Sequence, residues 1–268
     1  MQSLVWLVVV LFCVSTYAQG KVDGFYKSKN QGAIVIGGGF EDSKKYVAGN
    51  TTLDLERSTY YISMFTAYGI SDNLDVNISL PYISSNKENN LQDISVFLKY
   101  KLLKYTLEHG IIEVSAVAGL STPISNYSLG GLNDIGQQAT ILDTRGMFHF
   151  KANTSWFVTL QSGFSYKLAE VPNSIPATLK VGKATSRWYY DLYYDYQHTF
   201  GGINYRGTPA PQNFRELGVD FHKVGGTLYR PFSTKWGAFA TIAYIFDGRN
   251  VFLGGAYGLG LAYNFDLN

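Results

Sequence analysis

The sequence has a single cysteine, and it lies close to the N-terminus. Cys13 falls within an apolar stretch that we expect to be removed, so the mature chain would form no disulfide and no thiolate metal site. After this stretch, no apolar run approaches the roughly 18 residues of a membrane-spanning helix. No run of Lys or Arg occurs, and the formal net charge is only +2. The sequence therefore excludes helical membrane spans and gives no support to nucleic-acid binding.

The first 18 residues, MQSLVWLVVVLFCVSTYA, have the pattern of a secretory signal peptide. Their apolar core, Leu4 to Val14, is too short to cross a bilayer of about 30 Å as a helical anchor. Small residues precede an expected cleavage site before Gln19, although the segment before the core has no Lys or Arg. We expect residues 1–18 to be a signal peptide, residues 19–30 a periplasmic segment or partial plug, and residues 31–268 one domain.

Apolar and polar residues alternate along most of the remaining chain. In LDVNISLPY, Leu74 to Tyr82, the residues of one parity are apolar and most of those between them are polar, which predicts a strand with one apolar face. The pattern recurs to the C-terminus without a linker that would divide the chain. We predict twelve strands, over residues 31–40, 56–69, 74–83, 92–103, 110–121, 138–151, 156–168, 176–184, 187–200, 213–229, 236–246 and 251–265.

The connections between these strands alternate in length. Those after even-numbered strands are short, whereas most of those after odd-numbered strands are longer and rich in Gly, Asn, Ser and Pro. Bacterial outer-membrane barrels have short periplasmic turns and longer extracellular loops. The predicted fold is therefore an all-β, transmembrane, antiparallel up-and-down barrel in contact with outer-membrane lipid. A secreted β-sandwich or jelly roll would also alternate, but the loop lengths and the lack of disulfides favour the barrel.

Charged side chains gather on one parity of the predicted strands. They cannot face lipid, where a Lys or Arg at the midplane costs about 2–4 kcal/mol, so they should line the lumen. They could select ions or solutes, or simply fill the lumen with salt bridges. The small residues on one parity of strand 251–265 should leave room inside. The candidate lining residues are Asp75, Asp93, Lys99, Lys101, Glu113, Arg145, His149, Lys151, Lys167, Arg187, Asp191, Asp195, Glu216, Asp220 and His222.

Two segments carry a family resemblance. The segments YGISDNLDVNISLPY, from Tyr68, and LQDISVFLKYKL, from Leu91, resemble the meta-pathway phenol-degradation family of bacterial outer-membrane proteins, often labelled transporters. Gln92 departs from the Gly that this family tends to have. The resemblance implies an outer-membrane channel for small or aromatic compounds. The residues that match the family pattern are Gly69, Ser71, Asp72, Leu80, Pro81, Asp93, Lys99 and Tyr100.

The C-terminus departs from the usual pattern of such barrels. They commonly end on an aromatic residue that the barrel-insertion machinery reads, whereas here three residues follow Phe265. We expect this machinery to be a partner, either with the extension tolerated or with a weaker insertion signal.

The sequence contains no motif for catalysis or metal binding. Its four histidines, His109, His149, His198 and His222, lack metal-motif spacing, and there is no Gly-x-Ser-x-Gly elbow. We therefore predict no catalytic residue and no cofactor. The leading hypothesis is a passive channel for a small solute, gated by loops or by the N-terminal segment. The alternatives are a barrel enzyme acting on lipid or peptide through His198 or His222, and a structural or adhesive barrel.

Overall fold

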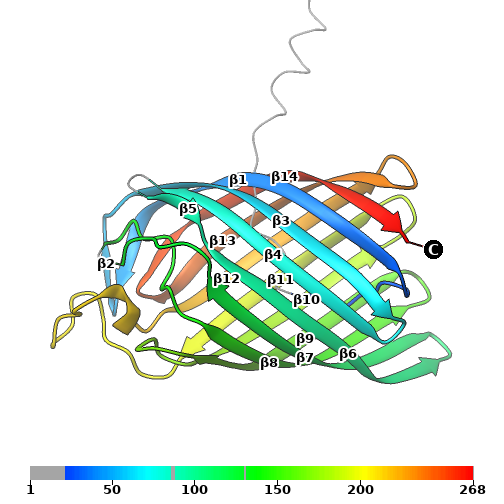
Figure 1. Ribbon diagram of the computed structural model, residues 1–268, viewed down its shortest axis with the longest axis horizontal. Coiled ribbons are helices and arrows are strands. Elements are labelled where there is room, and N and C mark those ends of the chain that lie inside the picture. Colours follow the sequence, from blue (N-terminus) through cyan, green and yellow to red (C-terminus); the bar gives the residue numbers. More distant parts are fainter. Residues whose placement is uncertain (1–21, 86–87, 130, 268) are drawn as a thin grey trace, which may run out of the picture.

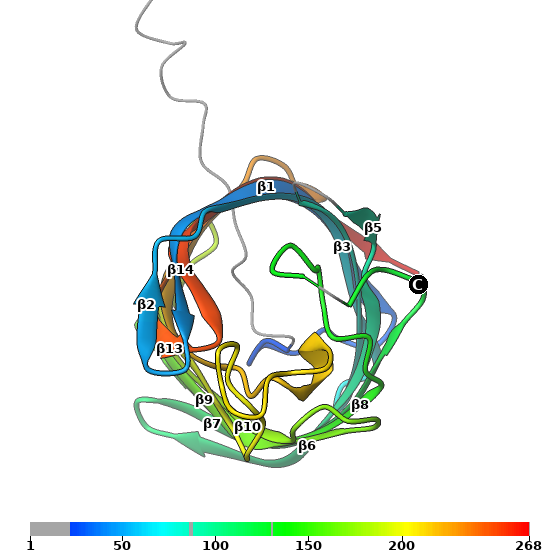
Figure 2. The same cartoon turned by 90° about the vertical axis from the view of Figure 1, so that its left-hand side faces the viewer.

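The chain forms a closed antiparallel barrel (Figures 1 and 2) in a computed structural model that describes residues 22–85, 88–129 and 131–267. Each long strand pairs with the next along the chain, and β14 pairs with β1 to close the wall. Two short strands, β2 (Thr51–Leu53) and β5 (Asn89–Leu91), extend β1 and β4 at one end. The wall consists of β1 (Gln31–Ala48), β3 (Arg57–Ser71), β4 (Leu74–Ser85), β6 (Asp93–Leu107), β7 (Gly110–Pro123), β8 (Ile141–Ala152), β9 (Trp156–Lys167), β10 (Ser174–Ala184), β11 (Tyr189–Thr199), β12 (Asp220–Pro231), β13 (Trp236–Arg249) and β14 (Val251–Asp266).

The predicted fold class and the twelve wall strands are confirmed, and two of the strand limits differ from the prediction by more than four residues. β1 continues to Ala48, beyond the predicted end at residue 40, because its outer part still pairs with β14. That part, which begins EDSKKY, lacks the alternation that lipid imposes. The sequence pattern therefore predicted an end of the strand that is too early. β12 begins at Asp220 rather than at residue 213, since Phe214–Glu216 form a short 3-10 helix in the preceding loop.

The two ends of the barrel differ as the connection lengths predicted. Short turns join β3 to β4, β6 to β7, β8 to β9, β10 to β11 and β12 to β13 at one end (right in Figure 1). The long connections, residues 124–129 with 131–140 and residues 200–219, lie at the other end. Because short turns are periplasmic in bacterial barrels, we call these the periplasmic end and the outer end. No helix in the described part of the chain is long and apolar enough to cross a membrane.

The outer face of the wall is apolar. Exposed large side chains recur at alternate positions, for instance Leu192 at 74% and Ile62 at 59% exposure. The residues between them point inward and are often polar and buried, such as Asp191 next to Leu192. On β14 most of the inward residues are small, including Ala256 and Ala262, whereas Phe252 near the start of the strand is a large inward residue. This leaves space in the lumen, which the N-terminal segment and two loops partly occupy.

Candidate functional site: the barrel lumen

Residues 22–30, the N-terminal segment, lie inside the barrel against its wall (blue in Figure 2). Val22 is 1% exposed and packs in an apolar cluster with Phe97, Val117 and Met147 from three wall strands. At the other end of the segment, the amide of Asn30 donates to the carbonyl of Gly69, 2.9 Å away. The segment is therefore held by the wall along its length before β1 begins.

Lys99 and Asp75, which face each other on β6 and β4, hold the backbone of the N-terminal segment. The Lys99 ammonium donates to the carbonyls of Asp23 at 2.9 Å and Phe25 at 2.6 Å. The Asp75 carboxylate accepts from the amide of Lys27 at 3.1 Å and lies 3.4 Å from Lys99. Both side chains are almost fully buried, so these charge-assisted bonds are shielded from water.

A second ionic contact fixes the start of the segment. The Asp23 carboxylate lies 3.3 Å from the ammonium of Lys180 on β10, and Lys180 also lies 3.6 Å from Asp191 on β11. The carbonyl of Val22 accepts from the side-chain amide of Gln161 at 3.3 Å. One lysine thus bridges the segment and the wall.

Aromatic contacts complete the attachment. The Phe25 ring packs edge-on against His149, at 4.7 Å between centroids, and against Phe157, at 4.9 Å. The Tyr26 hydroxyl donates to Ser115, 2.7 Å away. Gly24 lies so close to the wall that a Cβ there would stand 2.3 Å from Nδ1 of His149. A larger residue at position 24 would therefore move the segment or the histidine.

At the outer end, residues 124–129 and 131–140, the Tyr127 loop, fold back into the mouth of the barrel (green in Figure 2). Tyr127 is 4% exposed and packs with Tyr61, Ile83 and Ile135. Its hydroxyl donates to the carboxylate of Asp93 at 2.6 Å and accepts from the amide of Gln138. Burial, with this carboxylate next to it, raises the pKa of the Tyr127 hydroxyl well above its usual range, so the hydroxyl remains a donor.

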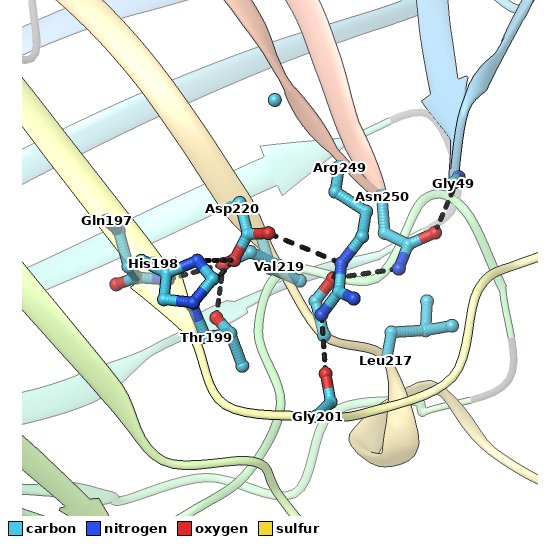
Figure 3. Close-up of polar contacts among 12 residues, drawn as sticks. Gly49, Gln197, His198, Thr199, Gly201, Leu217, Val219, Asp220, Arg249 and Asn250 are labelled. Atoms are coloured by element: carbon cyan, nitrogen blue, oxygen red, sulfur yellow. Dashed lines mark hydrogen bonds and ion pairs between the residues drawn. The ribbon is translucent and has the colours of Figure 1, made fainter.

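Residues 200–219, the Phe214 loop, cover another part of the mouth and are fastened at their base (Figure 3). Arg249 donates to the carbonyls of Gly218 and Gly201 and lies 3.4 Å from Asp220. Asn250, in the tight turn between β13 and β14, donates to Gly218 and Ile203 and accepts from the amides of Gly49 and Tyr205. Two adjacent residues of the wall thus fix both ends of the loop.

The two loops are joined to each other. The Arg215 guanidinium donates to the carbonyl of Gln137 at 3.2 Å and to the carbonyl and side chain of Gln138 at 3.3 and 3.2 Å. In return, the side-chain amide of Gln137 donates to the carbonyls of Phe214 and Leu217, at 3.2 and 3.3 Å. These bonds, the loop latch, make one lid of two segments that are distant in the sequence.

A cavity of about 530 Å³, the outer chamber, lies below this lid. Its charged groups are largely paired: Lys223 lies 2.9 Å from Asp195, and Arg145 lies 3.4 Å from Asp143. An adjoining cavity of about 320 Å³ shares Arg57, Lys223 and Phe252 with it. The lining therefore combines salt bridges with an apolar lid, and its aromatic and apolar members include Tyr46, Leu132, Ile135, Phe214, Leu217, Phe221 and Phe252.

The predicted lining residues fall into three groups inside the barrel. The first group borders the outer chamber and consists of Asp93, Arg145, Lys167 and Asp195. The second surrounds the N-terminal segment, directly or through Lys180, and consists of Asp75, Lys99, His149 and Asp191. The third lies near the periplasmic mouth and consists of Lys101, Glu113 and Lys151. These sets belong to separate places and do not form one ring of charge.

Four predicted lining residues lie elsewhere. Glu216 belongs to the 3-10 helix of the Phe214 loop, because the wall strand starts after it. His222 packs against Tyr194, Tyr196 and Phe246 on the outer face, and its Nδ1 is 2.6 Å from the Tyr194 hydroxyl. It shares its parity with the exposed Val224 and Leu228, whose contact with lipid decides the orientation of β12.

The other two lie at opposite rims. Asp220 is the first residue of β12, at the outer rim, where its carboxylate accepts from the amide of Thr199 and pairs with Arg249. Arg187 is exposed in the turn that precedes β11, because that strand begins at Tyr189 rather than at residue 187.

Several lumen residues were missed by the prediction. Lys180 alternates with the outward-facing Leu179 and Val181, so the parity rule applied to strand 176–184 could have found it. Lys223 was missed because the opposite parity of β12 was assigned to the lumen. Glu41 and Arg57 lie 3.6 Å apart. Glu41 stands in a segment that was predicted as a loop, and Arg57 is the second residue of the predicted strand that follows this loop.

The histidines considered for catalysis do not form a catalytic arrangement. His198 is half exposed and lies 3.8 Å from Asp220, but the neighbouring Thr199 hydroxyl donates to the carbonyl of Val219 rather than to the histidine (Figure 3). His222 lies on the lipid-facing side, away from the lumen. Within the described ranges, no group of three His, Cys, Asp or Glu side chains could hold a metal ion.

No family model matches the sequence, and no curated protein is similar to it, so the resemblance to the meta-pathway phenol-degradation family is not confirmed. Solved structures are similar in fold. The COG4313 outer membrane channel from Pseudomonas putida F1 has a TM-score of 0.72 and 15% identity, covering 91% of this chain and 100% of that one. The NanC porin has a TM-score of 0.56 and 10% identity, covering 86% and 98%. The closed barrel and its apolar outer face place the protein in the bacterial outer membrane.

Proposed function

We propose that the protein is a gated, passive outer-membrane channel for a small solute. The observation that carries this proposal is the arrangement of the lumen: a wall lined with polar groups encloses a chamber between a two-loop lid and an N-terminal segment. A solute would enter past the lid, occupy the outer chamber and leave past the N-terminal segment, which acts as a plug. The fold that this chain shares with a channel and a porin supports the proposal of a channel.

The solute we propose is small and partly apolar, such as an aromatic compound. The lining of the outer chamber offers aromatic rings from the lid and wall, such as Phe214 and Phe252, beside paired charges such as Lys223 with Asp195. A volume of about 530 Å³ is within the range of small-molecule sites, roughly 300–1,000 Å³. The paired charges argue against a strongly ion-selective pore, because opposite charges cancel each other's field.

Single-channel recording in planar bilayers tests the channel and its plug together. The mature chain would be compared with a variant that lacks residues 19 to 30 and keeps the whole wall. We expect small, intermittent currents from the mature chain and a larger, steadier conductance from the variant. If both proteins are silent although correctly folded, the channel proposal is wrong and a structural or adhesive role gains weight.

The solute class needs a separate measurement. Vesicles that contain the variant lacking residues 19 to 30 would be tested for uptake of a neutral aromatic solute and of a sugar of similar size. We expect faster uptake of the aromatic solute. Equal rates that depend on size alone would contradict the proposed preference and leave the channel itself unaffected.

A further inference from the structure

A further cavity, of about 500 Å³, opens at the periplasmic end beside the N-terminal segment. We call it the periplasmic pocket. One side of it consists of Phe25, Tyr26, Lys27 and Ser28 of the segment, and the other sides come from the turn after β3 and from β6, β7 and β8. The pocket in this form therefore exists only while the segment is seated in the lumen.

The charge of the periplasmic pocket is unbalanced. Four lysines line it, Lys27, Lys101, Lys104 and Lys151, against two carboxylates, Asp72 and Glu113. Glu113 already lies 2.8 Å from Lys101, and the Asp72 carboxylate accepts from the backbone amide of Lys29 at 3.1 Å. Among the residues that the structure describes, Lys27, Lys104 and Lys151 form no ion pair. The pocket thus offers three ammonium groups to an anion from outside the chain.

Two aromatic rings border these lysines. The Lys101 ammonium lies 4.3 Å from the centre of the Tyr26 ring, and the Lys151 ammonium lies 5.9 Å from the centre of the Phe25 ring. The rings give a ligand an apolar surface while the ammonium groups take its charges. This combination suits a small organic molecule with two or three negative charges better than a single halide ion.

We propose that the periplasmic pocket binds a small multivalent organic anion and that this binding holds the N-terminal segment in place. The inference rests on the proposed role of that segment as a plug. A ligand that binds only the seated state stabilises it by an amount that grows with ligand concentration relative to Kd. An anion that accumulates in the periplasm would therefore close the channel from the periplasmic side.

Citrate is the probe, because it is small and carries three carboxylates. Its binding to the purified mature chain would be measured by titration calorimetry at constant ionic strength, and channel open time would be recorded with citrate on each side in turn. We expect binding, and a shorter open time with citrate on the periplasmic side. The variant Lys104→Gln/Lys151→Gln should bind at least tenfold more weakly, since two of the three unpaired charges are gone.

The control is Lys183→Gln, which removes a lysine at the same end of the barrel but outside the pocket, where it lies over Trp156. It should bind citrate as the unaltered chain does. Equal affinity in all three proteins, or no binding at all, would refute the site. Binding without a change in open time would refute the coupling. The variant lacking residues 19 to 30 separates the two proposals, because its conductance tests the plug without citrate.

Discussion

Asp75 and Lys99 stand directly opposite each other on β4 and β6, and both bind the backbone of the N-terminal segment. Lys99 donates to two carbonyls of the segment, and Asp75 accepts from one of its amides. Each charge neutralises the other, since they lie 3.4 Å apart. The pair therefore satisfies the backbone of a segment that forms no strand here, and this holds an irregular chain in the lumen.

Removing Lys99 should release the segment. In Lys99→Met, both carbonyls lose their charge-assisted donor, and such bonds contribute about 1.5–3 kcal/mol each. We expect the open fraction of single channels to rise at least tenfold. Because Asp75 would remain buried and unpaired, the variant Lys99→Met/Asp75→Asn serves as a check on folding, judged by heat-modifiable mobility in gels. An unchanged open fraction in both folded variants would show that this pair does not hold the plug.

Gly24 allows a test that changes no charge. In Gly24→Leu the new side chain would meet His149, whose Nδ1 lies 2.3 Å from the position of a Cβ, so the segment should leave the wall. We expect longer open times in planar bilayers and faster protease cleavage within residues 22–30. Gly146→Leu, at an exposed position of β8 where an added Cβ meets nothing within 4 Å, is the control and should behave as the unaltered chain. Equal effects of the two substitutions would contradict a close fit at Gly24.

The loop latch should govern the outer entrance. Arg215→Gln removes a guanidinium that makes three hydrogen bonds to the Tyr127 loop, so the lid should separate into two mobile loops. Limited proteolysis of outer-membrane vesicles, with protease added outside, should then cut residues 124–140 several times faster. Arg206→Gln removes the same charge from an exposed position of the Phe214 loop and should leave the rate unchanged. If the two variants are cut alike, charge rather than the latch protects the loop.

The wall could be predicted from the sequence because lipid imposes a simple rule on every strand. Leu192 must face outward, so its neighbour Asp191 faces inward, and the same parity places most other wall residues. The contents of the lumen follow no such rule. Nothing in the sequence specifies that Asp23 meets Lys180 or that Arg215 meets Gln137, because these contacts depend on how irregular segments fold inside a finished barrel.

The errors also have physical causes. His222 was assigned to the lumen because its segment places polar groups on both parities, and only the apolar Val224 and Leu228 show which parity meets lipid. Glu216 was assigned to a strand because the loop before β12 has no strong turn signal at its end. Sequence parity thus fails where a strand leaves the membrane, since the lipid no longer constrains it.

Leu192 faces lipid, so a substitution there directly tests which face of the wall contacts the membrane. Leu192 is 74% exposed, and an arginine at the centre of such a face costs roughly 2–4 kcal/mol. We expect Leu192→Arg to lower the free energy of unfolding in lipid vesicles by about this amount, measured by denaturant titration of tryptophan fluorescence. Ser186→Arg, in the exposed periplasmic turn before β11, adds the same charge where water can hydrate it. It should change stability little, and a loss as large as that of Leu192→Arg would mean that net charge, not contact with lipid, decides the cost.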